Sequence, residues 1–422
     1  MKRRDFIKSL LAVSLFAPIS KLLAKGKTAA SAAETAAPAG KVVTRTINGI
    51  TAPLLGFGTM RLPRKVKGEP DIDYGKTEQL FARALECGVN YFDTAYFYHR
   101  GKSEVCVGDL LSKYPRESYI LADKMPVRML KTEADLERIW QEQLKRCKTK
   151  YFDFYLLHAL NGRNWENAKK LKVYEFLKKK QEKGEIKYLG FSFHDKPAVL
   201  EKIASSYKWD FAQIQLNYYD WTQYKSKEQY EILTRYNIPV IVMEPLRGGA
   251  LAKLNEEAVK ILKRANGAAS PASWAFRYIA DLPNVLCVLS GMSQMEHLDD
   301  NIATFSKVVP LTKREKGVIA GALAAYLKRG AVPCTDCRYC LPCPVGVAIP
   351  KIFSMYNDFK LNGNFEKLEK SYSALAPEEQ AQECVSCMAC VKKCPQSIAI
   401  PQELTRIGKE MAMLKKKTAA GK

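Results

Sequence analysis

The chain lacks several features that would place it in a protein class at once. No G-x-G-x-x-G follows the first expected strand, which argues against a Rossmann dinucleotide domain. No stretch beyond the N-terminal segment is long and apolar enough for a transmembrane helix, which needs about 20 residues. RNA-binding aromatic motifs and DNA-binding helix signatures are also missing, so the net charge of +23 does not indicate a nucleic-acid partner. The basic excess indicates a solvated lysine surface, or steering towards an acidic redox protein or an anionic envelope surface.

Cysteine is abundant, and eight of the 12 cysteines lie in two short runs that each end in Cys-Pro. C-x-x-C spacing brings three thiolates to one iron–sulfur cluster, and the cysteine before proline usually binds the cluster of the partner run. On this rule the first 4Fe-4S cluster is bound by Cys334, Cys337, Cys340 and Cys394. The second is bound by Cys384, Cys387, Cys390 and Cys343.

Zinc sites and disulfides are the alternatives for these cysteines. Zinc takes four ligands per site, whereas six of the eight cysteines fall into two triplets. Disulfides suit an exported chain but do not account for the matched triplets or the two Cys-Pro endings. The spacing therefore favours two 4Fe-4S clusters, and the segment resembles a bacterial two-cluster ferredoxin module. One difference is that two residues, instead of three, separate Cys340 from Cys343.

The N-terminus has the pattern of an export signal. Residues 1–8 read MKRRDFIK, and a short apolar run over residues 9–19 follows. This is similar to a twin-arginine signal, apart from Lys2, where serine or threonine is usual; a Sec signal or a basic amphipathic start is the alternative. The twin-arginine route transports folded proteins, so clusters assembled in the cytoplasm would cross intact. We therefore expect a periplasmic or exported protein, with the cytoplasm as the alternative.

The region before the cysteine runs has the pattern of one α/β domain. A hairpin is expected around Asn48-Gly49, and strand-like and helix-like runs then alternate. The expected strands are 54–59, 89–92, 119–122, 152–157, 188–192, 211–216, 240–243 and 285–289, with helices that include 77–86, 132–145, 168–183 and 227–236. Eight strands, each followed by a helix, predict a (β/α)8 TIM barrel rather than an open doubly wound sheet.

Four polar residues lie at the ends of consecutive expected strands. Asp93 ends the second strand, Tyr98 follows it, and Lys124 and His158 end the third and fourth. Chemistry in such barrels takes place at the C-terminal ends of the strands, where these side chains would converge. A carbonyl that accepts a hydride needs a proton; Tyr98 is the expected donor, with Lys124 lowering its pKa. His158 would orient the carbonyl oxygen, although a structural ion pair, a core tyrosine and a structural histidine are the alternative interpretation.

Three segments around these residues resemble the aldo-keto reductases. They are DTAYFYHRGKSE (93–104), ADKMP (122–126) and YLLHAL (155–160), and the resemblance extends over residues 42–310. It implies that Asp93, Tyr98, Lys124 and His158 are catalytic and that NAD(P)H is the cofactor. With its two cysteine runs, the chain resembles the iron–sulfur subgroup of that family.

The resemblance also implies which residues contact the dinucleotide. The nicotinamide corresponds to Ser192, Gln213 and Met243, the 2′-phosphate to Gly291 and His297, and the adenine side to Asp300 and Asn301. Phe193 and Met243 replace the asparagine and tyrosine that are usual in the family. Gly291 and His297 replace a lysine and an arginine, so a 2′-phosphate would lose its charged partners and the sequence does not favour NADPH over NADH.

We therefore expect a signal and linker over residues 1–40, a barrel over 41–310, a helix and cluster module over 311–405, and a basic tail over 406–422. The cluster loop begins where the reductases usually have a specificity loop, so the module is expected to border the substrate pocket. The expected function is interconversion of a small carbonyl and alcohol, coupled to electron transfer by two 4Fe-4S clusters, with a redox protein as a potential partner. The alternative is an exported iron–sulfur electron-transfer or binding protein whose barrel no longer turns over.

Overall fold

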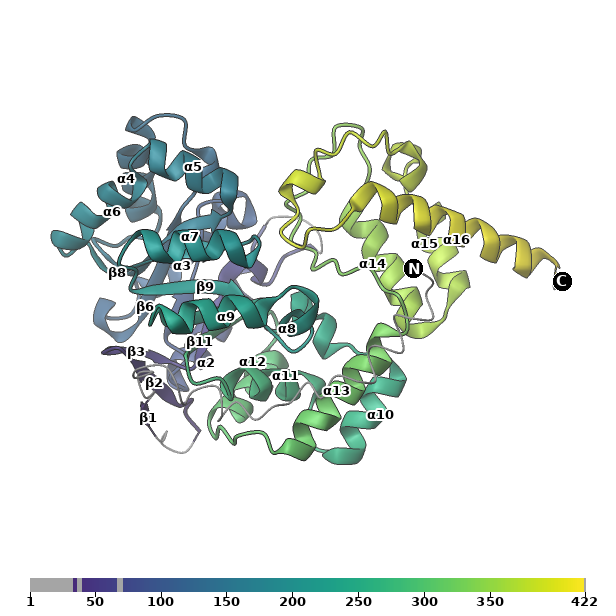
Figure 1. Ribbon diagram of the computed structural model, residues 1–422, viewed down its shortest axis with the longest axis horizontal. Coiled ribbons are helices and arrows are strands. Elements are labelled where there is room, and N and C mark those ends of the chain that lie inside the picture. Colours follow the sequence, from purple (N-terminus) through teal and green to yellow (C-terminus); the bar gives the residue numbers. More distant parts are fainter. Residues whose placement is uncertain (1–32, 36–39, 67–70, 421–422) are drawn as a thin grey trace.

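A closed barrel of eight parallel strands forms the larger part of the molecule (Figure 1). The computed structural model describes residues 33–35, 40–66 and 71–420. Around the barrel the strands are β4 (Leu55–Gly58), β5 (Tyr91–Asp93), β6 (Ile120–Met125), β7 (Phe152–Leu160), β8 (Ile186–Phe193), β9 (Phe211–Gln215), β10 (Val240–Met243) and β11 (Val285–Ser290). Pairing of β11 with β4 closes the barrel, which confirms the (β/α)8 prediction.

Amphipathic helices surround the strands and bury their apolar faces against them. They are α2 (Tyr74–Glu86), α3 (Lys102–Leu111), α4 (Ala134–Arg146), α5 (Gly162–Lys170), α6 (Val173–Glu182), α7 (Pro197–Ser206), α8 (Asp220–Gln223), α9 (Ser226–Arg235), α10 (Glu256–Ala265), α11 (Pro271–Ala280) and α12 (Met295–Phe305). Short 3-10 turns are η3 (Thr59–Arg61), η4 (Tyr98–Gly101), η5 (Arg116–Ser118), η6 (Val127–Met129) and η7 (Arg247–Ala252). The single helix expected over 168–183 is two helices, because Lys172 takes a left-handed φ of 50° between them.

A hairpin closes the N-terminal end of the barrel. Strands β2 (Thr44–Ile47) and β3 (Ile50–Pro53) pair around the expected turn, and Ile47 and Ile50 are buried among side chains of the barrel interior. Strand β1 (Ala33–Thr35), within the expected linker, pairs with β2, whereas the expected signal at the start of the chain lies outside the described residues. The functional end of the barrel is therefore the opposite one.

The C-terminal module lies beside the barrel and contains helices α14 (Ile349–Asn362), α15 (Phe365–Ser373) and α16 (Ile400–Ala420), with turns η8 (Pro377–Glu379), η9 (Ala381–Glu383) and η10 (Val391–Lys393) (Figure 1). Helix α13 (Lys313–Leu327), which the sequence assigned to this module, packs against α10 on the barrel. The tail expected from residue 406 is part of α16, where Ile407 and Met411 are buried in the module core. None of the helices in the described part of the chain combines the length and apolar character of a membrane span.

Candidate functional site

The structure brings the four expected catalytic residues together at the open end of the barrel. Lys124 Nζ donates hydrogen bonds of 2.6 Å to Asp93 Oδ1 and 2.6 Å to the Thr94 carbonyl oxygen. Gln213 Nε2 donates to the second oxygen of Asp93 at 3.0 Å. The ammonium of Lys124 lies 5.0 Å from the ring centre of Tyr98. Parallel strands bring Asp93 and Lys124 into contact because β5 and β6 are neighbours.

His158 lies beside the phenol. Its ring stacks on Phe97 with 4.7 Å between centroids, and the ring centres of Tyr98 and His158 are 6.0 Å apart. Burial lowers the pKa of His158 well below its ordinary value, and the positive charge of Lys124 acts in the same direction. Its buried Nδ1 has no hydrogen-bond partner within the described residues. A buried polar atom of this kind costs about 1–3 kcal/mol, which a substrate oxygen could recover.

The pKa of Tyr98 differs from the expectation. Burial raises this pKa well above its ordinary value, and the carboxylates of Asp93 and Glu244 act in the same direction. Lys124 therefore does not lower the pKa of Tyr98 as expected, because its ammonium group is paired with Asp93. Tyr98 keeps its proton through neutral pH, which suits a proton donor.

The cluster module contributes a residue to this site. Tyr339 lies between Cys337 and Cys340, and its ring centre is 5.7 Å from that of Phe97. The guanidinium of Arg128 lies 4.1 Å from the Phe97 ring centre and 5.0 Å from that of Tyr339. Sequence reasoning missed Tyr339, because an aromatic residue inside a cysteine loop does not indicate which surface the loop faces.

Further contacts join the module to the barrel rim. Arg247 donates to the Pro333 carbonyl at 2.9 Å and forms a buried ion pair with Asp220. The amides of Gln215 and Gln396 exchange two hydrogen bonds of 2.8 Å. Pro333 precedes one cysteine run and Gln396 follows the other. The module therefore borders the substrate end of the barrel, as the sequence predicted.

Four thiols from both runs line one cavity, and its cysteines are Cys334, Cys337, Cys340 and Cys394. Burial raises the pKa of Cys334 to about 11 and that of Cys340 to about 12, which favours the neutral thiols. A positively charged iron core would offset this cost and stabilise the ligating thiolates. All cysteines of the described chain are free of disulfides. Within that part of the chain, no three His, Cys, Asp or Glu side chains converge closely enough for a single metal ion. Spaced thiols around a cavity fit a 4Fe-4S cluster better than zinc.

The second cysteine run has the same local backbone as the first. In the first run Asp336 and Arg338 take positive φ values of 51° and 64°, and in the second Ser386 and Met388 take 53° and 62°. Left-handed conformations are unfavourable for such residues and persist where the surroundings enforce them. The repeated loop fits a second cluster, and the assignment of Cys343 to it stays a prediction.

The residues expected to hold the nicotinamide are bonded within the barrel. Gln213 donates to Asp93, and Ser192 Oγ accepts a hydrogen bond of 2.7 Å from the backbone N–H of Ala159. Met243 ends β10 and is half-buried.

The residues expected at the adenosine end form hydrogen bonds within the protein or face solvent. Asp300 accepts from Ser270 Oγ at 2.7 Å, and Asn301 donates to Ser290 Oγ at 2.9 Å. His297 is exposed on α12, and the side chain of Arg61 packs over Gly291. These residues therefore already have contacts within the protein, and at Gly291 the contact is with the side chain of Arg61.

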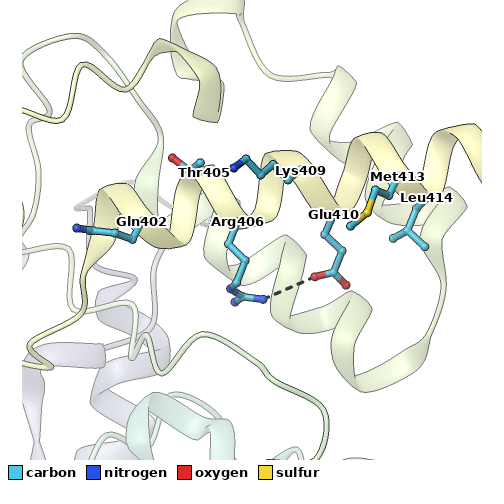
Figure 2. A pocket seen from close by; sticks show the side chains of 7 residues that line it. All are labelled: Gln402, Thr405, Arg406, Lys409, Glu410, Met413 and Leu414. Carbon is cyan, nitrogen blue, oxygen red and sulfur yellow. Dashed lines mark ion pairs between the residues drawn. The ribbon is translucent and has the colours of Figure 1, made fainter. Parts of the chain in front are cut away.

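A separate groove lies on helix α16 (Figure 2). Its lining residues are Gln402, Thr405, Arg406, Lys409, Glu410, Met413 and Leu414. An ion pair of 3.6 Å joins Arg406 to Glu410 along the helix. The groove includes none of the cysteines and no barrel residue, so it is not the carbonyl site.

Comparison with known proteins agrees with this architecture. Residues 54–323 match the model of the Aldo/keto reductase family, and residues 333–399 match that of the 4Fe-4S dicluster domain. The uncharacterized oxidoreductase YqkF of Bacillus subtilis is 27% identical over 258 residues, which is 54% of this chain and 81% of that protein. An NADH-specific methylglyoxal reductase of Escherichia coli is 30% identical over 126 residues, 26% of this chain and 39% of that protein.

Solved structures show the same fold. An aldo-keto reductase from Bacillus halodurans in its holo form has a TM-score of 0.55 at 23% identity, over 66% of this chain and 95% of that one. A thermostable aldo-keto reductase solved with the inhibitor epalrestat has a TM-score of 0.55 at 22% identity, over 66% and 99%. With its barrel matched over most of its length, this chain belongs to the aldo/keto reductase family and has a 4Fe-4S dicluster domain at its C-terminal end.

Proposed function

We propose that the protein is an oxidoreductase that interconverts a small carbonyl and an alcohol at the barrel mouth, coupled to electron transfer by two 4Fe-4S clusters. The observation that supports it most is the assembled set of catalytic side chains. Lys124 is fixed by Asp93 under the ring of Tyr98, and a buried nitrogen of His158 beside them has no partner among the described residues.

The chemistry of these residues accounts for proton delivery to a carbonyl oxygen. A carbonyl that gains electrons develops negative charge on its oxygen, and Tyr98 holds a proton that it can donate there. Neutral His158 can donate a hydrogen bond to the same oxygen without the desolvation cost of an imidazolium. Donation leaves Tyr98 as a phenolate, the form from which alcohol oxidation would start, so the raised pKa of Tyr98 does not select a direction.

The cofactors of the proposed reaction differ in how well the residues fit them. Bound 4Fe-4S clusters would supply one-electron transfer, and the cavity lined by Cys334 and Cys394 fits one of them. NAD(P)H dependence is suggested by the family and by the NADH specificity of the Escherichia coli relative. It stays a prediction, because Gln213 and Ser192 already form hydrogen bonds within the barrel.

A Tyr98→Phe variant tests the proposal, with Tyr96→Phe as a matched control. Tyr96 bonds Glu142 at 2.6 Å on the outer side of the barrel, so losing its hydroxyl leaves the site intact. We expect Tyr98→Phe to lose about 10²- to 10⁴-fold in carbonyl reduction, with unchanged iron content, and Tyr96→Phe to stay near wild type. Anaerobic assays would use a panel of aldehydes, ketones and dicarbonyls with NADH, NADPH or reduced methyl viologen. Full activity of Tyr98→Phe would contradict the proposal.

The second candidate is an electron-transfer or binding protein with an inactive barrel. It is favoured by the position of the module, whose Tyr339 and Thr335 cover the rim near the site. It predicts that wild type reduces no carbonyl with any of the three donors while its clusters still accept electrons from dithionite. The same assays therefore separate the two candidates.

We also propose that the protein is exported by the twin-arginine route, on the basis of Arg3 and Arg4. Replacing both by lysine in the full chain should retain the protein in the cytoplasm, as followed by cell fractionation. Unchanged export of that variant would contradict the route.

A further inference from the structure

Arg61 crosses the path that the family's dinucleotide would follow. A dinucleotide reaching from Met243 to Gly291 must pass between the C-terminal ends of β10 and β11, which are neighbouring strands. Arg61 lies there: a Cβ on Gly291 would be 3.1 Å from the Arg61 Cβ and Cδ. Its guanidinium lies 3.6 Å from Glu244 Oε1, directly after β10. The side chain therefore bridges both sides of the path.

The cluster loop completes this bridge. Arg61 Nη2 donates to the Thr335 carbonyl oxygen at 2.5 Å, and Thr335 itself is buried. We call Arg61 with Gly291, Glu244 and Thr335 the Arg61 latch. Gly248 fits under it, with a φ of 65°, and a Cβ there would collide with the Thr335 carbonyl and lie 2.9 Å from Arg61 Nη2. The cluster loop can therefore pack against the rim at position 248 only because glycine has no side chain.

The charges of the path also disfavour a pyrophosphate. The side chain of Glu244 is mostly buried, with 14% exposed, and its carboxylate would repel phosphates placed between β10 and β11. The cation nearest to it, Arg61, is already bonded to the module. Arg247, the next cation along the rim, is used by Asp220 and the Pro333 carbonyl. Both arginines are therefore paired within the protein rather than available to neutralise the phosphates of a dinucleotide.

We infer that the dinucleotide groove of this barrel has become the docking surface of the cluster module, and that the holoprotein does not bind NAD(P)H there. The inference concerns the electron donor of the proposed reaction, so its consequence for catalysis rests on the proposed function. The reductant then belongs to another class, a low-potential one-electron carrier. Reduction of one carbonyl consumes two equivalents of that carrier and two protons, one reaching the oxygen through Tyr98 and the other reaching the carbon.

Nucleotide binding is the direct test. Full-length protein with its clusters would be purified anaerobically, denatured and analysed for released nucleotide, and titrated calorimetrically with NADH and NADPH up to 1 mM. We expect no nucleotide in the extract and no saturable heat. Nucleotide released at about one per chain, or saturation below 1 mM, would overturn the inference.

A glycine pair tests the docking surface. Gly248 and Gly249 both have positive φ, but a Cβ on Gly249 would meet nothing within 4 Å. Both substitutions strain the backbone, but only the one at Gly248 also collides with the cluster loop. We therefore expect Gly248→Ala to accelerate amide exchange of residues 333–340 about tenfold and Gly249→Ala to accelerate it much less. Equal exchange in the two variants would show that the loop is not held on this surface.

The inference and the proposed function fail on different results. Saturable nucleotide binding with Tyr98-dependent carbonyl reduction would sink the inference and leave the function. Absence of nucleotide binding, with no carbonyl reduction from reduced methyl viologen, would support the inference and contradict the proposed function.

Discussion

The barrel mouth and the cluster loops position their functional groups by different means. At the barrel mouth, neighbouring strands hold Asp93 and Lys124 within 2.6 Å of each other, and the polypeptide alone satisfies both charges. The cysteines lie on loops between short elements, beside residues such as Asp336 and Ser386 in left-handed conformations. Left-handed residues also occur at the barrel mouth, among them Arg100 and Glu244, so backbone strain does not distinguish the two regions. The charges at the barrel mouth are paired within the protein, whereas the thiols of the loops would be held as thiolates by a bound iron core.

Removal of iron should unfold the cluster module and leave the barrel folded. This is the largest effect that we expect. All five tryptophans of the chain lie in the barrel, at 140, 165, 209, 221 and 274. The wavelength of their emission maximum reports the folding of the barrel, whereas their emission intensity also depends on quenching by the clusters. Visible absorbance reports the clusters. After reduction and chelation we expect the absorbance and the amide protection of the module to be lost, with the wavelength of the tryptophan emission maximum unchanged. A module that keeps its protection without iron would remove the contrast.

Paired cysteine substitutions sharpen the same comparison. Cys334 and Cys394 line one cavity, so the double variant Cys334→Ser/Cys394→Ser should lose one cluster, from about eight to about four iron atoms per chain. The control Cys384→Ser/Cys394→Ser removes one ligand from each predicted cluster and should lose both. The opposite order, with no iron in Cys334→Ser/Cys394→Ser and about four iron atoms in Cys384→Ser/Cys394→Ser, would show that each run binds its own cluster.

The parts of this arrangement that sequence could predict are those with a local pattern. The alternation of strand and helix patterns predicted the barrel. The rule that chemistry lies at strand ends then selected Asp93, Tyr98, Lys124 and His158. The Arg61 latch has no local signal, because Arg61 and Thr335 are 274 residues apart. The helical pattern of α13 likewise specifies an apolar face but not that α10 is its partner.

The pKa of Tyr98 shows the same limit of local reasoning. The residue types suggested that Lys124 would dominate, and this was wrong. The raised pKa arises from burial and from carboxylates, one of which, Glu244, comes from a distant strand end. Electrostatics depends on depth and on long-range neighbours, neither of which spacing in the sequence reveals.

Lys124→Met should destabilise the barrel without affecting iron content. Lys124 is fully buried, and its removal leaves the Asp93 carboxylate without a countercharge, which costs about 3–5 kcal/mol in comparable buried pairs. Urea unfolding followed by tryptophan emission measures this loss. The double variant Asp93→Asn/Lys124→Met removes the unpaired charge and should recover part of the stability. A double variant as unstable as the single one would be inconsistent with an ion-pair origin.

Acidification should weaken the barrel through His158. Its folded-state pKa is depressed by burial, so below about pH 6.5 the unfolded chain binds a proton that the folded protein does not. Stability therefore falls as pH falls, by at most about 1.4 kcal/mol per pH unit from this group. Between pH 7.5 and 5.5, His158→Gln should lose about 1 kcal/mol less than wild type. His297→Gln, at an exposed position on α12, is the control and should follow the wild-type curve.

Tyr339 gives the smallest expected effect and tests whether the two regions share one pocket. Its ring contacts Phe97 and Arg128, and such aromatic contacts contribute about 0.5–1.5 kcal/mol. Tyr339→Leu should therefore raise the KM for an aryl ketone about 2- to 10-fold with little change in kcat, whereas Tyr339→Phe, which keeps the ring, should restore the wild-type KM. A loss confined to kcat, with an altered cluster potential, would place Tyr339 in electron transfer instead. An unchanged KM in both variants would mean that the substrate does not reach the module, and that the barrel mouth and the cluster loops act separately.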